Sequence, residues 1–189
     1  MSYDGYSTKN SVVVVYTGEG KGKTSASLGL MARALGAGHR VAYIQFIKHW
    51  DVSEHNFIRE VQGIYGDKLM LYIGGKGFYK AGDQSAKDVT ETQHADEAVK
   101  TYKKAISSIT SGDYDLVVCD EINNAVHDGL ITEKDLLELI GKKHSTTSIC
   151  ITGRNFPLRF VRKADIVTNM TKLYHHYDDK YLANEGIDY

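Results

Sequence analysis

Apolar, largely β-branched runs recur along the chain and are bounded by Gly, Asp and Asn. A short apolar run that is rich in Val and Ile predicts a strand. The runs are continuous rather than alternating, so we expect strands that are buried on both faces of a sheet. The expected strands are residues 12–16, 41–46, 69–73, 116–119, 148–152 and 166–168.

Segments with helical character lie between several of these strands. They are residues 24–37, roughly 86–110, 133–142 and 158–164. The alternation of strand and helix predicts a mostly parallel sheet with helices on both faces, which is a three-layer α/β fold. The first of these helices is apolar almost all round, so we expect it to be largely buried, with Gly36 or Gly38 at its C-terminal end.

Two further segments, residues 47–65 and 74–84, carry many polar residues and glycines without a clear period. We interpret both as functional loops, because loops on a rigid scaffold commonly carry binding residues. The chain has no internal repeat and no linker-like stretch, and Pro157 is its only proline. We therefore expect one domain over residues 1–189.

A glycine-rich segment directly follows the first expected strand and opens into the first expected helix. Residues 17–24 read TGEGKGKT, close to the phosphate-loop pattern G-x-x-x-x-G-K-[ST], with Thr17 at the first glycine position. Such a loop turns several backbone N–H groups toward the oxygens of a polyphosphate. The alternative is a glycine-rich turn without a ligand, but a turn has no need of a Lys–Thr pair at the start of a helix. The expected nucleotide-binding residues are Gly18, Glu19, Gly20, Lys21, Gly22, Lys23, Thr24 and Ser25.

Two carboxylates, Asp120 and Glu121, end the apolar strand at residues 116–119. In phosphate-loop folds an acid at the end of a neighbouring strand completes the shell of a magnesium ion, whose other protein ligand is the loop threonine, here Thr24. Strands also run into acidic loops without any such role. The pairing with a phosphate loop favours a magnesium–nucleotide site, with either carboxylate as the ligand.

The remaining polar and sulfur-bearing candidates point less specifically to a function. Arg154 follows the strand at residues 148–152, at the sheet edge where α/β folds bind ligands, and it could hold a phosphate or ribose or be an exposed turn residue. The pair His175 and His176 lies on a segment that alternates like a strand and is no metal motif by itself, so we expect metal-free histidines. Cys119 and Cys150 lie inside apolar runs, which predicts buried thiols.

Composition narrows the class of protein. The 189 residues are 42% hydrophobic and 25% charged, which is typical of a globular chain that buries its own core. The formal net charge of −1 argues against nucleic acid as the main partner. The polar N-terminal residues show no signal peptide, and no apolar run approaches the ~20 residues that span a bilayer. We therefore expect a cytoplasmic protein without a membrane partner.

From residue 12 to residue 189 the chain resembles the phosphate-loop type of ATP:corrinoid adenosyltransferase. The matching motifs are, in order, GEGKGKT at residues 18–24, QFIK at 45–48, GF at 77–78, TQ at 92–93, DEIN at 120–123, TGR at 152–154 and GIDY at 186–189. Several of these are weak individually. Their order and spacing together make the resemblance specific.

The resemblance implies a RecA-like phosphate-loop fold, usually a homodimer, that acts in making adenosylcobalamin. It implies transfer of the 5'-deoxyadenosyl group of ATP to the Co(I) of a corrinoid, with triphosphate as the leaving group and a separate reductase supplying the reduced cobalt. It implies that Gly20, Gly22, Lys23 and Thr24 bind phosphates, that Mg²⁺, or Mn²⁺ in its place, is held by Thr24 with Glu121 or Asp120, and that Arg154 contacts the nucleotide. Phe78 would face the corrinoid.

Two departures from the family pattern bear on the corrinoid side. Relatives usually follow the phenylalanine with Thr-Trp, whereas Tyr79 and Lys80 follow Phe78 here. Relatives also often carry a longer leading segment that closes over the site, so we expect any lid to come from residues 1–11 or 47–65. Phe78 follows the glycine-rich residues 74–77, which we interpret as a flexible run rather than part of the core.

Three functions remain open on the residues alone. The leading hypothesis is corrinoid adenosylation. A small-molecule kinase or ATPase acting at the γ-phosphate is the enzymatic alternative, although such kinases often have an arginine-rich lid and the arginines here are few and scattered. A non-enzymatic module that ATP orders for partner binding is the third. The chemical identity of the products separates them.

Overall fold

The computed structural model describes residues 3–47, 52–76 and 89–188. Six strands form one parallel sheet in the order β3-β2-β4-β5-β1-β6. They are β1 Val13–Thr17, β2 Val41–Gln45, β3 Leu69–Ile73, β4 Leu116–Asp120, β5 Ser148–Thr152 and β6 Ile166–Asn169. The expected strands agree with these to within one residue at each end.

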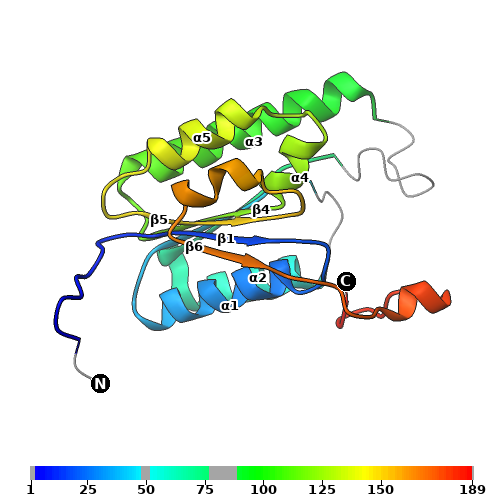
Figure 1. Ribbon diagram of the computed structural model, residues 1–189, viewed down its shortest axis with the longest axis horizontal. Helices are drawn as coiled ribbons and strands as arrows, with labels where there is room; N and C mark the ends of the chain where they lie inside the picture. The colour runs from blue at the N-terminus through cyan, green and yellow to red at the C-terminus, as the bar shows by residue number, and fades with distance from the viewer. Residues whose placement is uncertain (1–2, 48–51, 77–88, 189) are drawn as a thin grey trace.

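Helices cover both faces of the sheet. Figure 1 shows α3 Glu91–Ser111, α4 Ile122–His127, α5 Glu133–Gly141 and the 3₁₀ helix η3 Leu158–Lys163 on one face, and α1 Lys23–Gly36 and α2 Ser53–Tyr65 on the other. Two short 3₁₀ helices, η1 Gly66–Lys68 and η4 His176–Asp179, complete the described elements. The three-layer α/β prediction is therefore confirmed. Within the described residues, no helix has the length and apolar character that crossing a membrane requires.

Neighbouring strand residues contribute to two separate cores, one under each helical layer. Tyr43 packs on the α1 and α2 side while Ile44 faces the opposite layer, and both are fully buried. This alternation follows from the two-residue period of a strand. Each fully buried large apolar side chain contributes about 1.5–3 kcal/mol of transfer free energy, so the central strands form the stable frame of the molecule.

The helix expected from about residue 86 begins later, at Glu91. The hydroxyl of Thr90 accepts a hydrogen bond from the N–H of Gln93, and the side chain of Gln93 accepts one from the N–H of Thr90. This capping box fixes the helix start. The expected helix at residues 158–164 is instead the 3₁₀ helix η3, and α4 had no counterpart among the expected elements.

The interpretation of residues 47–65 as a loop was wrong for most of its length, because residues 53–65 form α2. Ile58, Val61 and Tyr65 lie on one face of α2 and pack in the core beneath it. Their i, i+3, i+7 spacing is a helical signal that the polar residues between them obscured.

The helix α1 is also less buried than expected. Ser27, Met31, Ala34 and Leu35 form a single buried face, while the opposite face is exposed. Gly38 follows the helix with φ of 85° and donates to the carbonyl of Leu35, so it terminates the helix as predicted.

Candidate active site

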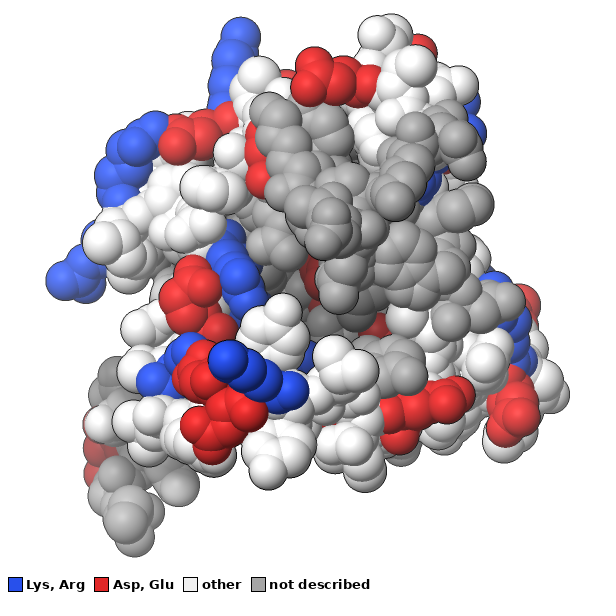
Figure 2. Space-filling model, turned by 90° about the vertical axis from the view of Figure 1, so that its right-hand side faces the viewer, with Lys and Arg blue, Asp and Glu red and all other residues white. Residues whose placement is uncertain are grey.

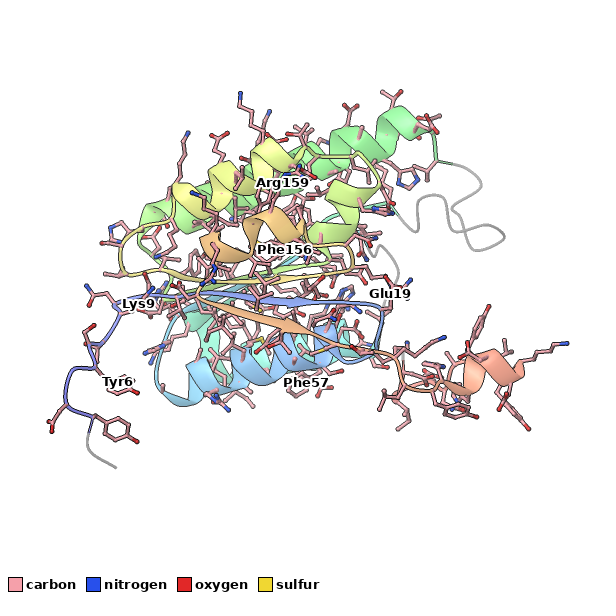
Figure 3. The ribbon with its side chains drawn as sticks, in the orientation of Figure 1. Tyr6, Lys9, Glu19, Phe57, Phe156 and Arg159 are labelled. Carbon is pink, nitrogen blue, oxygen red and sulfur yellow. The ribbon has the colours of Figure 1, made fainter. Side chains whose placement is uncertain are left out.

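The polar residues singled out in the sequence gather at the carboxyl ends of the central strands. The phosphate loop follows β1, the acidic pair ends β4, and Arg154 follows β5. Because all strands are parallel, these three ends meet at one edge of the sheet. Figure 3 shows Glu19 of the loop at this edge and Lys9 at the opposite one.

A buried carboxylate lies at the centre of the edge. Asp120 is fully buried, and its two oxygens accept hydrogen bonds from different threonines: Oδ1 from Thr152 Oγ1 at 2.6 Å and Oδ2 from Thr24 Oγ1 at 3.2 Å. Buried carboxylates need such partners because desolvation of the charge is costly. The tertiary structure thus connects the loop threonine of the predicted site to the acidic strand.

Glu121 is oriented by two neighbours. Its backbone has a φ of 61°, and its N–H donates to Thr152 Oγ1 at 2.8 Å. The side-chain amide of Gln45, at the end of β2, lies 3.5 Å from Glu121 Oε2. Positive φ is uncommon outside glycine and commonly occurs at functional positions. The hydroxyl of Thr152 therefore holds both carboxylate residues in place.

Gln45 and Thr152 have roles at this edge that the sequence patterns did not assign. Both side chains are fully buried. Within the described part of the chain, the Oε1 atom of Gln45 has no hydrogen-bond partner although it is buried. An unsatisfied buried acceptor next to two carboxylates indicates that a ligand or a water molecule donates a hydrogen bond to it. The sequence signals were their positions at strand ends and within the motifs QFIK at residues 45–48 and TGR at 152–154, which assigned neither residue a role.

Lys23 bends back over the phosphate loop. Its Nζ donates to the carbonyl oxygens of Gly18 at 2.7 Å and Gly20 at 2.6 Å. Partial burial, followed by the positive charge of Arg154, lowers the pKa of Lys23. A lysine held in this way can exchange carbonyl partners for phosphate oxygens, which are stronger acceptors.

The helix α1 begins at Lys23 with no side-chain cap. Gly22 precedes it with φ of 103°, a conformation that side chains rarely adopt. The first-turn N–H groups, those of Lys23, Thr24 and Ser25, therefore face no capping side chain and are available to an anion together with the helix dipole. Ser25 itself is exposed on the first turn.

Gly18 and Gly20 have a structural reason to be glycine that the phosphate pattern did not predict. A Cβ on Gly18 would lie 2.4 Å from the carbonyl oxygen of Met170, and one on Gly20 would lie 2.8 Å from the same atom. The N–H of Gly20 donates to that carbonyl at 2.7 Å. Lys21 also turns away from the loop, because its Nζ donates to the carbonyl of Asp188 at 2.7 Å.

Arg154 is directed toward the loop. Its backbone N–H donates to Asn124 Oδ1 at 2.7 Å, and its Nε lies 3.4 Å from Glu19 Oε2. Both side chains of this ion pair are more than half exposed, so solvent screening makes its contribution small. The guanidinium remains able to move to a phosphate.

Figure 2 shows this face of the molecule, where Lys and Arg side chains alternate with Asp and Glu and no single sign dominates. A shallow cleft of about 500 Å³ lies beside the loop, with Gly18, Phe156 and Met170 among its lining residues. Neither Lys23 nor the acidic pair lines it. The cleft therefore lies next to the predicted chemistry rather than over it.

Phe78, Tyr79 and Lys80 lie outside the described residues. Of the glycine-rich residues 74–77, which we predicted to be flexible, Gly74 and Gly75 are closely packed. A Cβ on Gly74 would overlap the side chain of Thr101, and one on Gly75 would lie 2.4 Å from the carbonyl oxygen of Ile47. Close packing therefore requires glycine at both positions.

The prediction for the two cysteines is confirmed, whereas the strand expected at the histidine pair is not found. Cys119 and Cys150 are buried, as predicted, and burial raises the pKa of both thiols. The expected strand at His175 and His176 is absent, because His176 begins the 3₁₀ helix η4.

The sequence profile of the family "ATP:corrinoid adenosyltransferase BtuR/CobO/CobP" matches residues 9–189. This chain belongs to that family. The match extends over the phosphate loop, the acidic pair and the C-terminal segment together. Members of this family are transferases, so the enzyme class expected from the motifs is confirmed.

Curated relatives agree with the family assignment. Corrinoid adenosyltransferases of Pseudomonas aeruginosa and Escherichia coli K12 are 29% and 27% identical to this chain over 96% of its length, and the matches cover 85% and 87% of those proteins. The corrinoid adenosyltransferase CobA of Salmonella typhimurium LT2 is 28% identical over 96% of this chain and 87% of its own.

Among solved structures, the flagellar accessory protein FlaH of Methanocaldococcus jannaschii has a similar fold. The TM-score is 0.52 with 13% identity, over 88% of this chain and 73% of that one. At this identity the likeness concerns the fold alone. It confirms the RecA-like phosphate-loop class expected for the sheet and its flanking helices.

Proposed function

We propose that this member of the family transfers the 5'-deoxyadenosyl group of Mg-ATP to the Co(I) of a corrinoid and releases intact triphosphate. The observation that carries the proposal is the contact between the phosphate loop and the acidic strand, made by Thr24 and Asp120 at 3.2 Å. This contact joins a triphosphate cradle to a carboxylate pair, which is the arrangement that a magnesium–nucleotide complex requires.

The donor set at this contact fits magnesium. In an octahedral shell with bonds of about 2.0–2.1 Å, adjacent oxygens are about 3 Å apart, close to the 3.2 Å between Thr24 Oγ1 and Asp120 Oδ2. The donors are all oxygens, as Mg²⁺ and Mn²⁺ prefer. Thr24, Asp120 and Glu121 would hold the ion, and the unsatisfied Gln45 Oε1 would accept a hydrogen bond from a water beside it. When bound, the ion supplies positive charge to the phosphate oxygens.

The chain itself stabilises the leaving group. Attack at C5' breaks the C5'–O bond, and the electron pair departs with the triphosphate. Lys23, the N–H groups at the start of α1 and Arg154 carry the complementary positive charge. They lie at one sheet edge, so they would act on the same triphosphate.

No protein nucleophile is needed in this reaction. Co(I) donates the electron pair that forms the cobalt–carbon bond and becomes Co(III). The two cysteines are unsuited to attack, because both are buried and their pKa values are raised above the ordinary thiol value. The protein then contributes positioning and electrostatic stabilisation.

The remaining parts of the proposal concern partners. We propose a homodimer in the cytoplasm that receives reduced corrinoid from a separate reductase. Phe78 would contact the corrinoid, and Tyr79 and Lys80 would take the positions of the Thr-Trp pair of relatives.

An anaerobic assay with chemically reduced cobalamin and Mg-ATP tests the proposal. We expect the absorbance of an adenosylated corrinoid to appear and ³¹P NMR to show one triphosphate for each product molecule. Formation of ADP and phosphate in step with corrinoid consumption would instead establish chemistry at the γ-phosphate.

A further inference from the structure

A second cluster of metal-binding residue types lies in the C-terminal segment that follows β6. His175, His176 and Asp188 each offer one ligand atom, and these atoms all lie within 4.8 Å of one another. We propose that these three residues bind one divalent transition-metal ion of the zinc class, at a site separate from the nucleotide. This proposal does not depend on the reaction proposed above.

The donor set selects the class of ion. Two imidazole nitrogens and one carboxylate oxygen are ligands that Zn²⁺ and its neighbours in the first transition series prefer. Mg²⁺ and Ca²⁺ favour oxygen-only shells, so they are disfavoured here. With three protein ligands, a water molecule would complete a four-coordinate shell.

The spacing of the donors is close to that of a tetrahedral site. With bonds of about 2.0–2.1 Å, tetrahedral ligands are roughly 3.3 Å apart. His176 Nε2 already lies 3.0 Å from Asp188 Oδ2. The ring nitrogen of His175 lies within 4.8 Å of the other two donors. It has to move toward them by at most about 1.5 Å to reach the tetrahedral spacing. The exposed segment that carries it can make this movement at low cost.

His176 and Asp188 form an ion pair when the imidazole is protonated. The Nε2 atom of His176 is shielded from solvent, and within residues 3–47, 52–76 and 89–188 no hydrogen bond other than this contact occupies it. The other carboxylate oxygen of Asp188 accepts the N–H of Asn184 at 2.7 Å. That bond orients the carboxylate toward the imidazole, as outer-shell partners of metal ligands do.

One existing hydrogen bond has to be exchanged. The Nδ1 atom of His175 accepts the N–H of Tyr177 at 3.1 Å. An ion at Nδ1 displaces this bond, and an ion at Nε2 moves the ring proton to Nδ1 with the same result. The cost is one hydrogen bond between neutral groups, which is weak beside the metal–ligand bonds that replace it.

The position of the cluster suggests what the ion would do. The segment contacts the phosphate loop through Met170, whose carbonyl accepts the N–H of Gly20, and through Asp188, whose carbonyl accepts Lys21 Nζ. An ion bound by His175, His176 and Asp188 would link the start of this segment to its end, between the two contacts with the loop. It would fasten the segment, shown beyond the end of the sheet in Figure 1, against the loop.

The test uses the full-length protein stripped of metal and titrated with Zn²⁺ alone against a chromogenic chelator. We expect one tightly bound equivalent, lost or weakened at least tenfold in His176→Ala and in Asp188→Asn. His39→Ala, which removes an exposed histidine from another part of the surface, is the matched control and should bind like the wild type.

Imidazole NMR resonances provide a readout that a loosened tail would not imitate. Zinc should shift the signals of His175 and His176 selectively, with the melting temperatures of all variants alike before metal is added. Equal zinc affinity in the wild type and both ligand variants would overturn the proposal. So would the absence of a bound equivalent, which would mean that the cluster is only an imidazole–carboxylate pair.

Discussion

The hydroxyl of Thr152 offers a direct test of the acidic network. It donates to Asp120 Oδ1 at 2.6 Å and accepts the N–H of Glu121 at 2.8 Å, in a fully buried position. Thr152→Val keeps the shape of the side chain and removes both bonds. The substitution leaves a buried carboxylate oxygen and a backbone N–H with fewer partners.

The expected magnitude follows from the two bonds. A hydrogen bond to a charged group contributes about 1.5–3 kcal/mol and a neutral one about 0.5–1.5 kcal/mol, so the loss should be about 3 kcal/mol. For a chain of this size, about 2–4 °C of melting temperature corresponds to each kcal/mol, which predicts a fall of about 6–12 °C.

Thr147→Val is the matched control. Thr147 is also fully buried, but its hydroxyl donates only to the carbonyl of Tyr114, at 2.7 Å. We expect a loss of about 1 kcal/mol in free energy of unfolding for this variant. Urea unfolding and calorimetry measure both.

The same pair separates function from stability. Thr152→Val should lower the rate of corrinoid adenosylation by about tenfold or more, because Asp120 and Glu121 lose their common anchor, whereas Thr147→Val should stay near the wild type. Equal destabilisation by the two substitutions would refute the reasoning. It would mean that Asp120 does not depend on Thr152 for its charge or position.

Four further predictions concern the loop and the corrinoid side. Lys23→Ala should lower kcat/KM by about 10²–10³ with little change in melting temperature, since Nζ hydrogen-bonds to loop carbonyls among the described residues; near-normal turnover at saturating ATP would contradict a role at the leaving group. The pKa of Lys23 is lowered in the free protein, and bound triphosphate should raise it. ATP binding at a pH between these two pKa values should therefore take up a proton, and its affinity should fall as the pH rises through this range. Calorimetry in two buffers measures the proton uptake, which Lys23→Met should abolish. Gly20→Ala should lower the free energy of unfolding by about 1–3 kcal/mol, because its Cβ would meet the Met170 carbonyl, whereas Gly29→Ala on open α1 surface should be neutral or stabilising. Phe78→Ala should slow turnover that starts from Co(II) far more than turnover from prepared Co(I); equal losses with a large fall in melting temperature would indicate a core residue.

The sequence by itself determined the features that depend on local pattern. Continuous apolar runs located the six described strands. The expectation of burial on both faces holds for β1, β2, β4 and β5, which need apolar side chains at nearly every position. It is wrong for β3 and β6, which are partly or mostly exposed because they lie at the two edges of the sheet. The glycine-rich segment before a Lys–Thr pair indicated the phosphate loop, because its geometry is formed within a few consecutive residues. The order of the motifs indicated the family.

Only the tertiary structure decided which distant residues act together. Thr152 contacts Asp120 because β5 pairs with β4, and the amide of Gln45 reaches Glu121 because β2 lies on the other side of β4. Gly20 is glycine in part because the chain leaving β6 passes within contact distance of the loop. His176 meets Asp188 through the folding back of the C-terminal segment. Such contacts join residues far apart in the chain, and no local pattern of hydrophobic and polar positions records them.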